Sequence, residues 1–310
     1  MSIVPDISII IVSYNVKDLL IKCISSIYKF ELDAFSIEII VVDNNSNDRS
    51  ADEISIIFPK VKLIRNKFNA GFSTGNNQGL KMGTGKFIFL LNPDTEFRSD
   101  VLSGLTKEIS TDTNIIIAPK LLNTNGSLQV SCFKFPGLLP VIAETFYLHR
   151  IFGINNYPHK LFNDKFYPDW SSGAALFFSR NIFNRVGPLD ENLFWMDDVD
   201  FCYRASKNGI RILFYPNVEL FHHSGKSSQK NLSVSISNQL LSKIKYFSKH
   251  KGKDVAFLAS IFILVQILSR VIIFLILSPL NNLYRVKLMA YIFAIKKYFR
   301  FVFLNDKTII

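Results

Sequence analysis

The chain has 310 residues and a formal net charge of +11. Residues 1–240 hold 24 Lys and Arg against 23 Asp and Glu, whereas residues 241–310 hold 12 against two. Three scattered cysteines, Cys23, Cys132 and Cys202, argue against a disulfide framework or a structural zinc site and favour a reducing, cytoplasmic setting. The basic residues of the last part flank long apolar runs, which favours a membrane surface over nucleic acid as the partner.

Short apolar runs alternate with helical patterns over the first hundred residues. Buried strands are predicted at residues 7–12, 37–42, 61–64 and 87–91. Helices are predicted between them, at residues 17–30, 49–58 and 76–82. This alternation predicts an open, mostly parallel, Rossmann-like α/β sheet with flanking helices. The first run has only six apolar residues and no basic region before it, so we expect no signal peptide.

After Asp112 the pattern becomes irregular, and residues 153–168, rich in Asn, aromatics and Pro, are predicted to form a mobile loop. Further strands are predicted at residues 115–119, 127–133, 170–179, 211–215 and 218–221. Further helices are predicted at residues 141–152, 181–186 and 198–208. The irregular pattern in this half of the chain contains no internal repeat.

The most apolar stretch, residues 255–277, is about as long as a helix that crosses a hydrocarbon core. Gln266 and Arg270 interrupt it and would share one helix face, so the helix either spans the membrane or lies in its interface. The alternative is a solvated helix followed by a buried core helix. A second apolar stretch, residues 288–304, carries three basic residues and is expected to be interfacial. We therefore predict a catalytic domain over residues 1–240 and a basic, apolar, membrane-associated helical tail over residues 241–310.

Polar side chains follow the predicted strands, at the edge where parallel sheets bind ligands. Asp94 with Asn92 suits a hard cation such as Mg²⁺ or Mn²⁺, although Asn-Pro-Asp is also common in turns. Asp43 could accept hydrogen bonds from a nucleotide base or ribose, or it could cap the next helix. Asn15 likewise lies just after the end of the first predicted strand.

Two more clusters follow in the second half of the chain. Asp197, Asp198 and Asp200 lie beside Trp195; packed carboxylates raise one another's pKa, so a desolvated one can act as a general base. The alternative is a helix N-terminus, where Asp is favoured, and Arg204 is spaced to pair with Asp200. The second cluster could complete a metal site or bind phosphate, or its histidines could be structural; it reads His222-His223-Ser224-Gly225-Lys226-Ser227.

In this order the motifs resemble the family 2 glycosyltransferases with a GT-A fold, most closely the bacterial rhamnosyltransferase-type members. The resemblance covers about residues 5–230. It rests on Val12-Ser13-Tyr14-Asn15, Val41-Val42-Asp43-Asn44-Asn45-Ser46, Asn69-Ala70-Gly71-Phe72-Ser73, Gly75-Asn76-Asn77, Leu91-Asn92-Pro93-Asp94, Ser172-Gly173-Ala174, Val186-Gly187-Pro188-Leu189-Asp190-Glu191, Asp197-Asp198-Val199-Asp200 with Arg204, and His222-x-x-Gly225-x-Ser227.

The resemblance implies roles for these residues. Asp198 would be the catalytic base, and Asp94 and His222 would hold a divalent cation, Mg²⁺ or Mn²⁺. The donor nucleotide would contact Ser13, Asn15, Asp43, Asn69, Gly71, Asn76 and Asn92. Acceptor binding or structural support would fall to Asp197, Asp200, Arg204 and Trp195. Asn92 stands where the family often has the first Asp of a DxD pattern, which thins the metal ligand set.

The function implied is an inverting glycosyltransferase of cell-surface polysaccharide synthesis. It would move a sugar, with rhamnose as one candidate, from a nucleotide-diphosphate donor to a hydroxyl of a lipid-linked or polysaccharide acceptor. It would work at the cytoplasmic face of the cell membrane, bound peripherally or anchored by its C-terminal tail. Two alternatives stay open: a nucleotidyltransferase of similar α/β fold, which Ser13-Tyr14-Asn15 disfavours, and a non-catalytic membrane scaffold.

Overall fold

A computed structural model describes residues 4–30, 35–149, 153–154, 156–223 and 232–303, and the chain divides into two compact units. The sheet unit consists of Met1–Lys134, Tyr157–Leu189 and Phe201–Ser224. The helical unit consists of Phe135–Asn156, Asp190–Asp200 and Gly225–Ile310. The predicted functional division near residue 240 stays a prediction.

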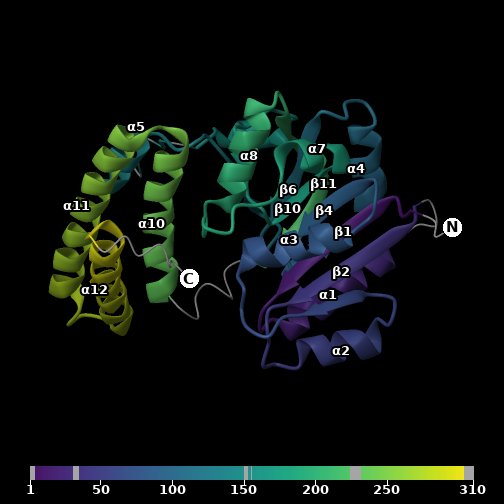
Figure 1. The fold of residues 1–310 in the computed structure, drawn as a ribbon, viewed down its shortest axis with the longest axis horizontal. Helices are drawn as coiled ribbons and strands as arrows, with labels where there is room; N and C mark the ends of the chain where they lie inside the picture. The colour runs from purple at the N-terminus through teal and green to yellow at the C-terminus, as the bar shows by residue number, and fades with distance from the viewer. Residues whose placement is uncertain (1–3, 31–34, 150–152, 155, 224–231, 304–310) are drawn as a thin grey trace. The chain divides into compact units, whose positions relative to one another are not determined.

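Within the described residues, nine strands form the main sheet of the sheet unit, in the order β3-β2-β1-β4-β10-β6-β11-β5, with β7 paired to β6 (Figure 1). The strands are β1 (Ile7–Ser13), β2 (Ile37–Asp43), β3 (Lys62–Arg65), β4 (Phe87–Leu91), β5 (Thr95–Phe97), β6 (Ile115–Leu122), β7 (Leu128–Gln129), β10 (Ala175–Ser179) and β11 (Arg211–His222). A separate two-stranded sheet joins β8 (Cys132–Phe133) and β9 (Trp170–Ser171).

The sheet is mixed rather than mostly parallel. β1, β2, β3 and β4 run parallel, as do β6 and β11, but β10 is antiparallel to both β4 and β6. β5 is antiparallel to β11. The prediction missed this because a strand buried on both faces is a continuous apolar run in either direction, so its sequence does not encode its orientation.

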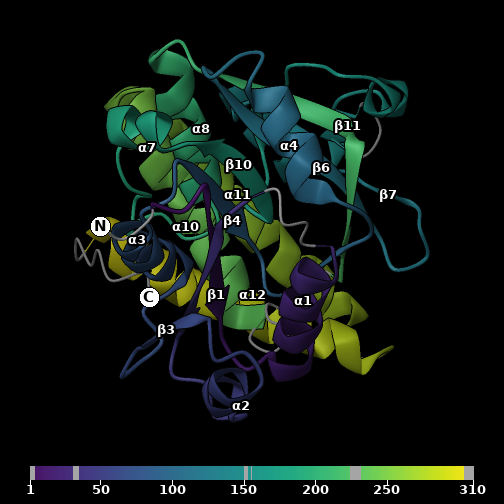
Figure 2. The same ribbon diagram turned by 90° about the vertical axis from the view of Figure 1, so that its right-hand side faces the viewer.

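Helices cover both faces of this sheet. They are α1 (Lys17–Lys29), α2 (Ser50–Ile57), α3 (Phe72–Met82), α4 (Val101–Ile109), α7 (Arg180–Val186) and α8 (Asp197–Lys207), and the first four residues of α8 belong to the helical unit. Figure 2 shows α1 and α4 on one side of the sheet and α3 and α7 on the other. A short 3₁₀ helix, η1 (His159–Asn163), lies in the segment predicted to be a loop.

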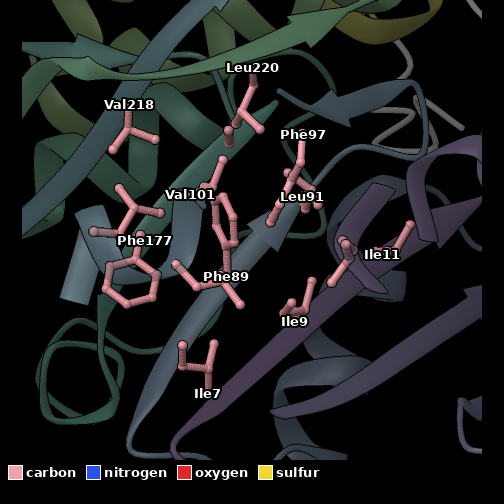
Figure 3. Packing of buried hydrophobic residues seen from close by; sticks show 14 of the residues in the cluster. Ile7, Ile9, Ile11, Phe89, Leu91, Phe97, Val101, Phe177, Val218 and Leu220 are labelled. Atoms are coloured by element: carbon pink, nitrogen blue, oxygen red, sulfur yellow. The ribbon is translucent and has the colours of Figure 1, made fainter. Parts of the chain in front are cut away.

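The side chains of β1 point alternately to the two faces of the sheet, and both faces are covered by helices. Ile7, Ile9 and Ile11 point to one face and join Phe89 and Phe177 in a buried cluster, whose packing Figure 3 shows. The residues between them face α3, and there two glycines of α3 allow a close approach. A Cβ added at Gly79 would lie 2.4 Å from a methyl carbon of Ile10. The absence of a side chain at Gly79 therefore lets the backbone of α3 pack directly against β1.

The helical unit is built from α5 (Leu138–Thr145), α10 (Leu232–His250), α11 (Lys253–Leu277) and α12 (Asn282–Phe303) (Figure 1). The last three pack around a core that includes Phe247, Ile263 and Tyr298. Gln266 and Arg270 lie on the buried face of α11, as their spacing predicts. Arg270 donates hydrogen bonds to the carbonyls of Glu144 and Thr145, and therefore caps the C-terminal end of α5.

Candidate active site

Three predicted site residues lie together at the carboxyl ends of neighbouring strands. β1 pairs in parallel with β2, so that Ser13 stands opposite Asp43. β4 pairs with the other side of β1, with Leu91 opposite Ile11, and Asn92 directly follows it. Ser13 and Asp43 are buried. This edge of the sheet is therefore lined by polar groups at the position where ligands bind to open α/β sheets.

Asp43 and Asn15 shape the turn that follows β2. The Asp43 carboxylate accepts a hydrogen bond from the backbone N–H of Ser46 at 3.0 Å and one from the Ser50 hydroxyl at 3.5 Å. Asn15 has a left-handed backbone, with φ 55°, and its side-chain oxygen accepts from the N–H of Asn47 at 2.7 Å. Asp48, one residue before the N-cap Arg49 of α2, accepts from the Ser50 N–H at 3.1 Å. The contact of Asp43 with a nucleotide base stays a prediction.

The loop before α3 holds its shape through asparagines and one glycine. The side-chain oxygen of Asn69 accepts from the Gly71 N–H at 3.0 Å. Gly71 has φ +86°, and no atom lies within 4 Å of the place where a Cβ would stand, so conformation rather than crowding selects glycine here. Asn76 is buried and donates to the Phe72 carbonyl within α3. Asn44, which directly follows β2, donates to the Gly71 carbonyl at 3.0 Å and thereby fixes the loop beside the end of β2.

Asp94 and His222 meet at the same edge of the sheet. The His222 Nε2 lies 3.2 Å from the Asp94 Oδ1, and both side chains are largely buried, with 11% and 14% exposed. His222 closes β11, which pairs with β5 immediately after Asp94. The Asn92 Nδ2 lies 3.5 Å from the same His222 nitrogen. The structure therefore brings together three of the residues predicted for the donor and metal sites.

A glutamine that sequence reasoning missed orients His222. The Gln129 Oε1, which can only accept, lies 2.6 Å from the His222 Nδ1. Nδ1 therefore carries the proton in the neutral imidazole, and the lone pair of Nε2 faces Asp94. Gln129 lies on the short strand β7, and nothing in the surrounding sequence marks it. Its role depends on the pairing of β7 with β6.

Two buried polar atoms at this edge have no hydrogen-bond partner within the described part of the chain. They are the Ser13 Oγ and the Asn92 Oδ1. A buried acceptor without a partner costs about 1–3 kcal/mol, so native proteins retain such an atom where a ligand, an ion or water satisfies it. The orphaned Asn92 carbonyl lies on the side chain that contacts His222. Both atoms belong to residues that the family resemblance predicts to contact the donor.

The residues at this edge could supply part of the ligand set of a divalent cation. Carboxylate and amide oxygens with one imidazole nitrogen are donors that Mn²⁺ accepts, and Mg²⁺ accepts the oxygens. No group of three or more His, Cys, Asp and Glu that could hold a metal occurs among the described residues. Asp94 and His222, with the Asn92 carbonyl nearby, would leave several positions for oxygens of a ligand. His223 faces away from this set, toward Glu96 at 3.2 Å.

The acidic cluster begins α8 and lies in the helical unit. Asp198 is half-buried, and its Oδ1 accepts from the N–H of Val199 at 2.7 Å. Asp197 and Asp200 are buried, whereas Trp195 is 45% exposed with a left-handed backbone of φ +69°. A partly exposed carboxylate suits the role of a base, since a substrate hydroxyl can reach it. The role itself stays a prediction.

Other predicted residues lie outside these groups. In the sheet unit, Arg204 donates to the carbonyls of Val186 and Pro188 and thereby holds the turn before the acidic segment. The residues predicted to bind phosphate, Gly225, Lys226 and Ser227, lie outside the described residues. That part of the histidine motif therefore stays a prediction from the sequence.

Comparison with known proteins adds to this geometry. Residues 8–129 match the family model described as "Glycosyl transferase family 2". The chain is 26% identical over 270 residues to the low-salt glycan biosynthesis hexosyltransferase Agl10 of Haloferax volcanii. This match covers 80% of this chain and 78% of the relative. It is 23% identical over 212 residues to an N-acetylglucosaminyl-diphospho-decaprenol L-rhamnosyltransferase of Mycobacterium tuberculosis, with 63% of this chain and 69% of the relative covered.

A solved structure extends over almost the whole chain. The mannosyltransferase PcManGT from Pyrobaculum calidifontis, in complex with GDP-Man and Mn²⁺, matches with a TM-score of 0.55. The match covers 98% of this chain and 89% of that one at 15% identity. At that identity the likeness concerns the fold.

Proposed function

Because the chain is a family 2 glycosyltransferase with a GT-A fold, we propose that it transfers a sugar from a nucleotide-diphosphate donor to an acceptor hydroxyl with inversion. The family and the fold class predicted from the sequence are thereby confirmed, apart from the mixed sheet. The observation that carries the proposed chemistry is the contact of Asp94 with His222 beside the orphaned carbonyl of Asn92.

Asp94 and His222 are the residues that would hold the divalent cation. When bound, such a cation stabilises the negative charge that develops on a leaving diphosphate. Gln129 fixes the imidazole so that Nε2 stays directed at the site, as outer partners of metal ligands do. Support for a cation comes from the Mn²⁺ in the structural neighbour and from the donor atoms present here.

Asp198 is proposed to take the proton of the acceptor hydroxyl. The acceptor oxygen then forms a bond to the anomeric carbon while the bond from that carbon to the phosphate oxygen breaks. The nucleoside diphosphate leaves with the electron pair, and the sugar carbon is inverted. General base catalysis of this kind contributes roughly 10²–10⁴ in rate.

The acceptor is proposed to be a glycan carried on a polyprenyl diphosphate, with rhamnose as one candidate for the sugar transferred. The relative from Mycobacterium tuberculosis is named for rhamnosyl transfer to a decaprenol-linked sugar, which supports both ideas. Such an acceptor stays in the bilayer, so the enzyme would have to work at the membrane surface.

The membrane contact is proposed to run along α11 and α12. Among the described residues, α11 alone is long and apolar enough to cross a membrane. One face of it is buried, and from Phe257 onward the opposite, exposed face is apolar. We call this the apolar stripe; its residues are Phe257, Leu258, Ile261, Val265, Leu268, Ile272, Leu275 and Ile276.

The neighbours of α11 favour a helix that lies in the plane of the membrane. Its buried face packs against α10, which carries Lys243, Lys245, Lys249 and His250. If α11 crossed the bilayer, Lys243 and Lys245 would lie inside the hydrocarbon beside it, and a Lys near the centre costs about 2.5–3.5 kcal/mol. Lys249 and His250 adjoin the start of α11 and would lie near the membrane boundary. With the stripe facing the lipid, these side chains keep their polar partners outside the hydrocarbon, and exposed basic residues such as Lys253 and Lys296 can meet anionic headgroups at about 1 kcal/mol each.

The proposed chemistry is tested by Asp198→Asn. Transfer from a nucleotide sugar should fall roughly 10²–10⁴-fold, because the amide cannot accept the hydroxyl proton, while nucleotide binding stays nearly intact. Candidate donors are dTDP-rhamnose, UDP-hexoses and GDP-mannose. The matched control is Glu191→Gln, which neutralises an exposed carboxylate of the same segment and should transfer sugar at the parent rate.

Product analysis separates this function from its alternatives. A glycosyltransferase releases a nucleoside diphosphate, whereas a nucleotidyltransferase releases pyrophosphate. If the Asp198→Asn variant transfers sugar as fast as the parent chain, the assignment of the base is wrong. If no nucleotide sugar is consumed in the presence of lipid-linked acceptors, the non-catalytic scaffold becomes the better hypothesis.

A further inference from the structure

A buried carboxylate in the helical unit is contacted by a lysine and a histidine. Asp200 is fully buried in the first turn of α8. Its Oδ1 lies 2.7 Å from the Lys249 Nζ and 2.6 Å from the His250 Nε2. Both partners come from the last turn of α10. Since an unpaired buried charge is strongly destabilising, these contacts make the place of Asp200 depend on α10.

The same turns of α10 also hold the beginning of the acidic segment. The Lys249 Nζ lies 2.6 Å from the Asp190 Oδ2, so one ammonium group bridges Asp190 and Asp200. One turn earlier, Lys245 donates to the Asn192 carbonyl at 3.2 Å. The segment Asp190–Asp200 is therefore attached to α10 near both of its ends.

The residues between these two attachments carry the proposed chemistry. Trp195 keeps a left-handed backbone, which a residue other than glycine retains only where its surroundings enforce it. Asp198 follows three residues later and stays half-buried. A segment fixed near both ends can hold such a strained backbone, and with it the direction of the Asp198 carboxylate.

We propose that Lys249 and His250 are positioning residues, which fix the segment Asp190–Asp200 so that Asp198 is held in the geometry for proton transfer. This inference rests on the proposed function, in which Asp198 is the base. It also means that the tail does more than attach the enzyme to a membrane. The chain leaves α10 through Gly252 and enters α11, which carries the apolar stripe.

The test compares two lysines of one helix. Lys243 and Lys249 both lie on α10 and both pair with a carboxylate, but Lys243 pairs with Glu144 of α5. Lys249→Met should lower kcat at least 10-fold with a water-soluble acceptor analogue, because small misplacements of a catalytic group cost up to about 10² in rate. The KM for the donor should stay within about twofold of the parent value, since the residues proposed to bind the donor lie in the sheet unit.

Three further variants complete the experiment. Lys243→Met should lower thermal stability less, because its partner Glu144 is partly exposed, and should leave kcat within about twofold of the parent value. Lys249→Arg keeps the charge and should restore most of kcat. His250→Gln keeps a hydrogen-bond donor toward Asp200 and should be milder than His250→Leu. If Lys249→Met does not fold, Asp190→Asn removes one attachment only and should give a smaller fall in kcat.

The outcomes separate this inference from the proposed function. If Asp198→Asn is inactive but Lys249→Met and Lys243→Met have the same kcat, Lys249 is not a positioning residue. If Asp198→Asn is fully active, the proposed function itself fails. Loss of donor binding together with kcat in Lys249→Met would also overturn the inference, because it would indicate general unfolding.

Discussion

Glu38 shows how one buried carboxylate can join four parts of the sheet unit. It accepts hydrogen bonds from the Ser8 hydroxyl and the backbone N–H of Thr84, and it pairs with Lys62 at 2.6 Å. Burial alone would raise its pKa, but the hydrogen bonds from Lys62, Ser8 and Thr84 outweigh burial and lower the pKa to about 2. The network ties the amino ends of β1, β2 and β3 to the start of β4.

This lowered pKa predicts a pH dependence of stability. A carboxyl group whose pKa is lower in the folded chain stabilises the fold above its ordinary pKa of 4.5, and this stabilisation is lost as the pH falls toward about 2. Glu38→Gln should lower the free energy of unfolding by about 1–3 kcal/mol at pH 7. The difference from the parent chain should shrink between about pH 5 and pH 2 in urea unfolding. A difference that is constant with pH would contradict this account.

The position of several candidate residues could be predicted from the ends of the strands. Asp43, Asn92 and Asp94 follow apolar runs, and parallel pairing brings such ends to one edge. The spacing of the histidine motif also selected His222, and it is His222 rather than His223 that meets Asp94. Neighbouring residues of a strand point to opposite faces, which separates the two histidines. Gln129 could not be predicted, because its contact with His222 joins residues that are 93 positions apart in the sequence.

Whole elements were predictable where the apolar pattern is continuous. β1, β2 and β4 lie within one residue of their predicted ends. The helix α4 was missed although its pattern is present: Leu102, Leu105 and Ile109 are spaced for one face, and Asp100 caps the start by accepting from the Ser103 N–H. The predicted strands at residues 211–215 and 218–221 are one strand, β11, with an irregular register between Tyr215 and Glu219.

The close approach of α3 to β1 leads to a prediction at the level of the element. Helix propensity alone favours Gly79→Ala by about 1 kcal/mol. The added methyl group would stand 2.4 Å from the Ile10 Cγ2 in the packed core, and such overlap costs about 1–3 kcal/mol. We expect net destabilisation, measured as a lower midpoint of urea unfolding. In the double variant with Ile10→Ala the two effects should not add, because the clashing methyl is gone.

At the scale of the molecule, composition located the basic tail but not everything that packs with it. The helical unit also takes up α5 and the acidic segment, which come from the middle of the sequence. Arg270 reaches the Thr145 carbonyl across 125 residues, and Lys249 reaches Asp190 across 59. Contacts of this range leave no local pattern, so no reading of charge or hydropathy along the chain could have found them.

The apolar stripe predicts how the whole protein meets a bilayer. Replacing Ile272 and Ile276 with Ser should weaken binding to vesicles of phosphatidylcholine and phosphatidylglycerol at least tenfold, because two exposed aliphatic side chains lose about 1.5–3 kcal/mol each on leaving the lipid. Binding is measured by cosedimentation at low and high salt. The matched control is Ile56→Ser, at an exposed apolar residue of α2.

The two modes of attachment differ in extraction. A helix that lies in the interface should be released from native membranes by alkaline carbonate, which leaves spanning helices in place. Retention of the parent chain after that treatment would contradict the in-plane arrangement and favour a spanning α11.

The three native thiols have a practical consequence. Cys23, Cys132 and Cys202 are all buried, and burial raises the pKa of Cys23 to about 12 and that of Cys132 to about 11. Thiol reagents attack the thiolate, so the folded parent chain should resist alkylation. A single cysteine placed at an exposed position of α11 could then carry an environment-sensitive fluorophore without removal of the native three. The emission of that dye would report directly on immersion in lipid.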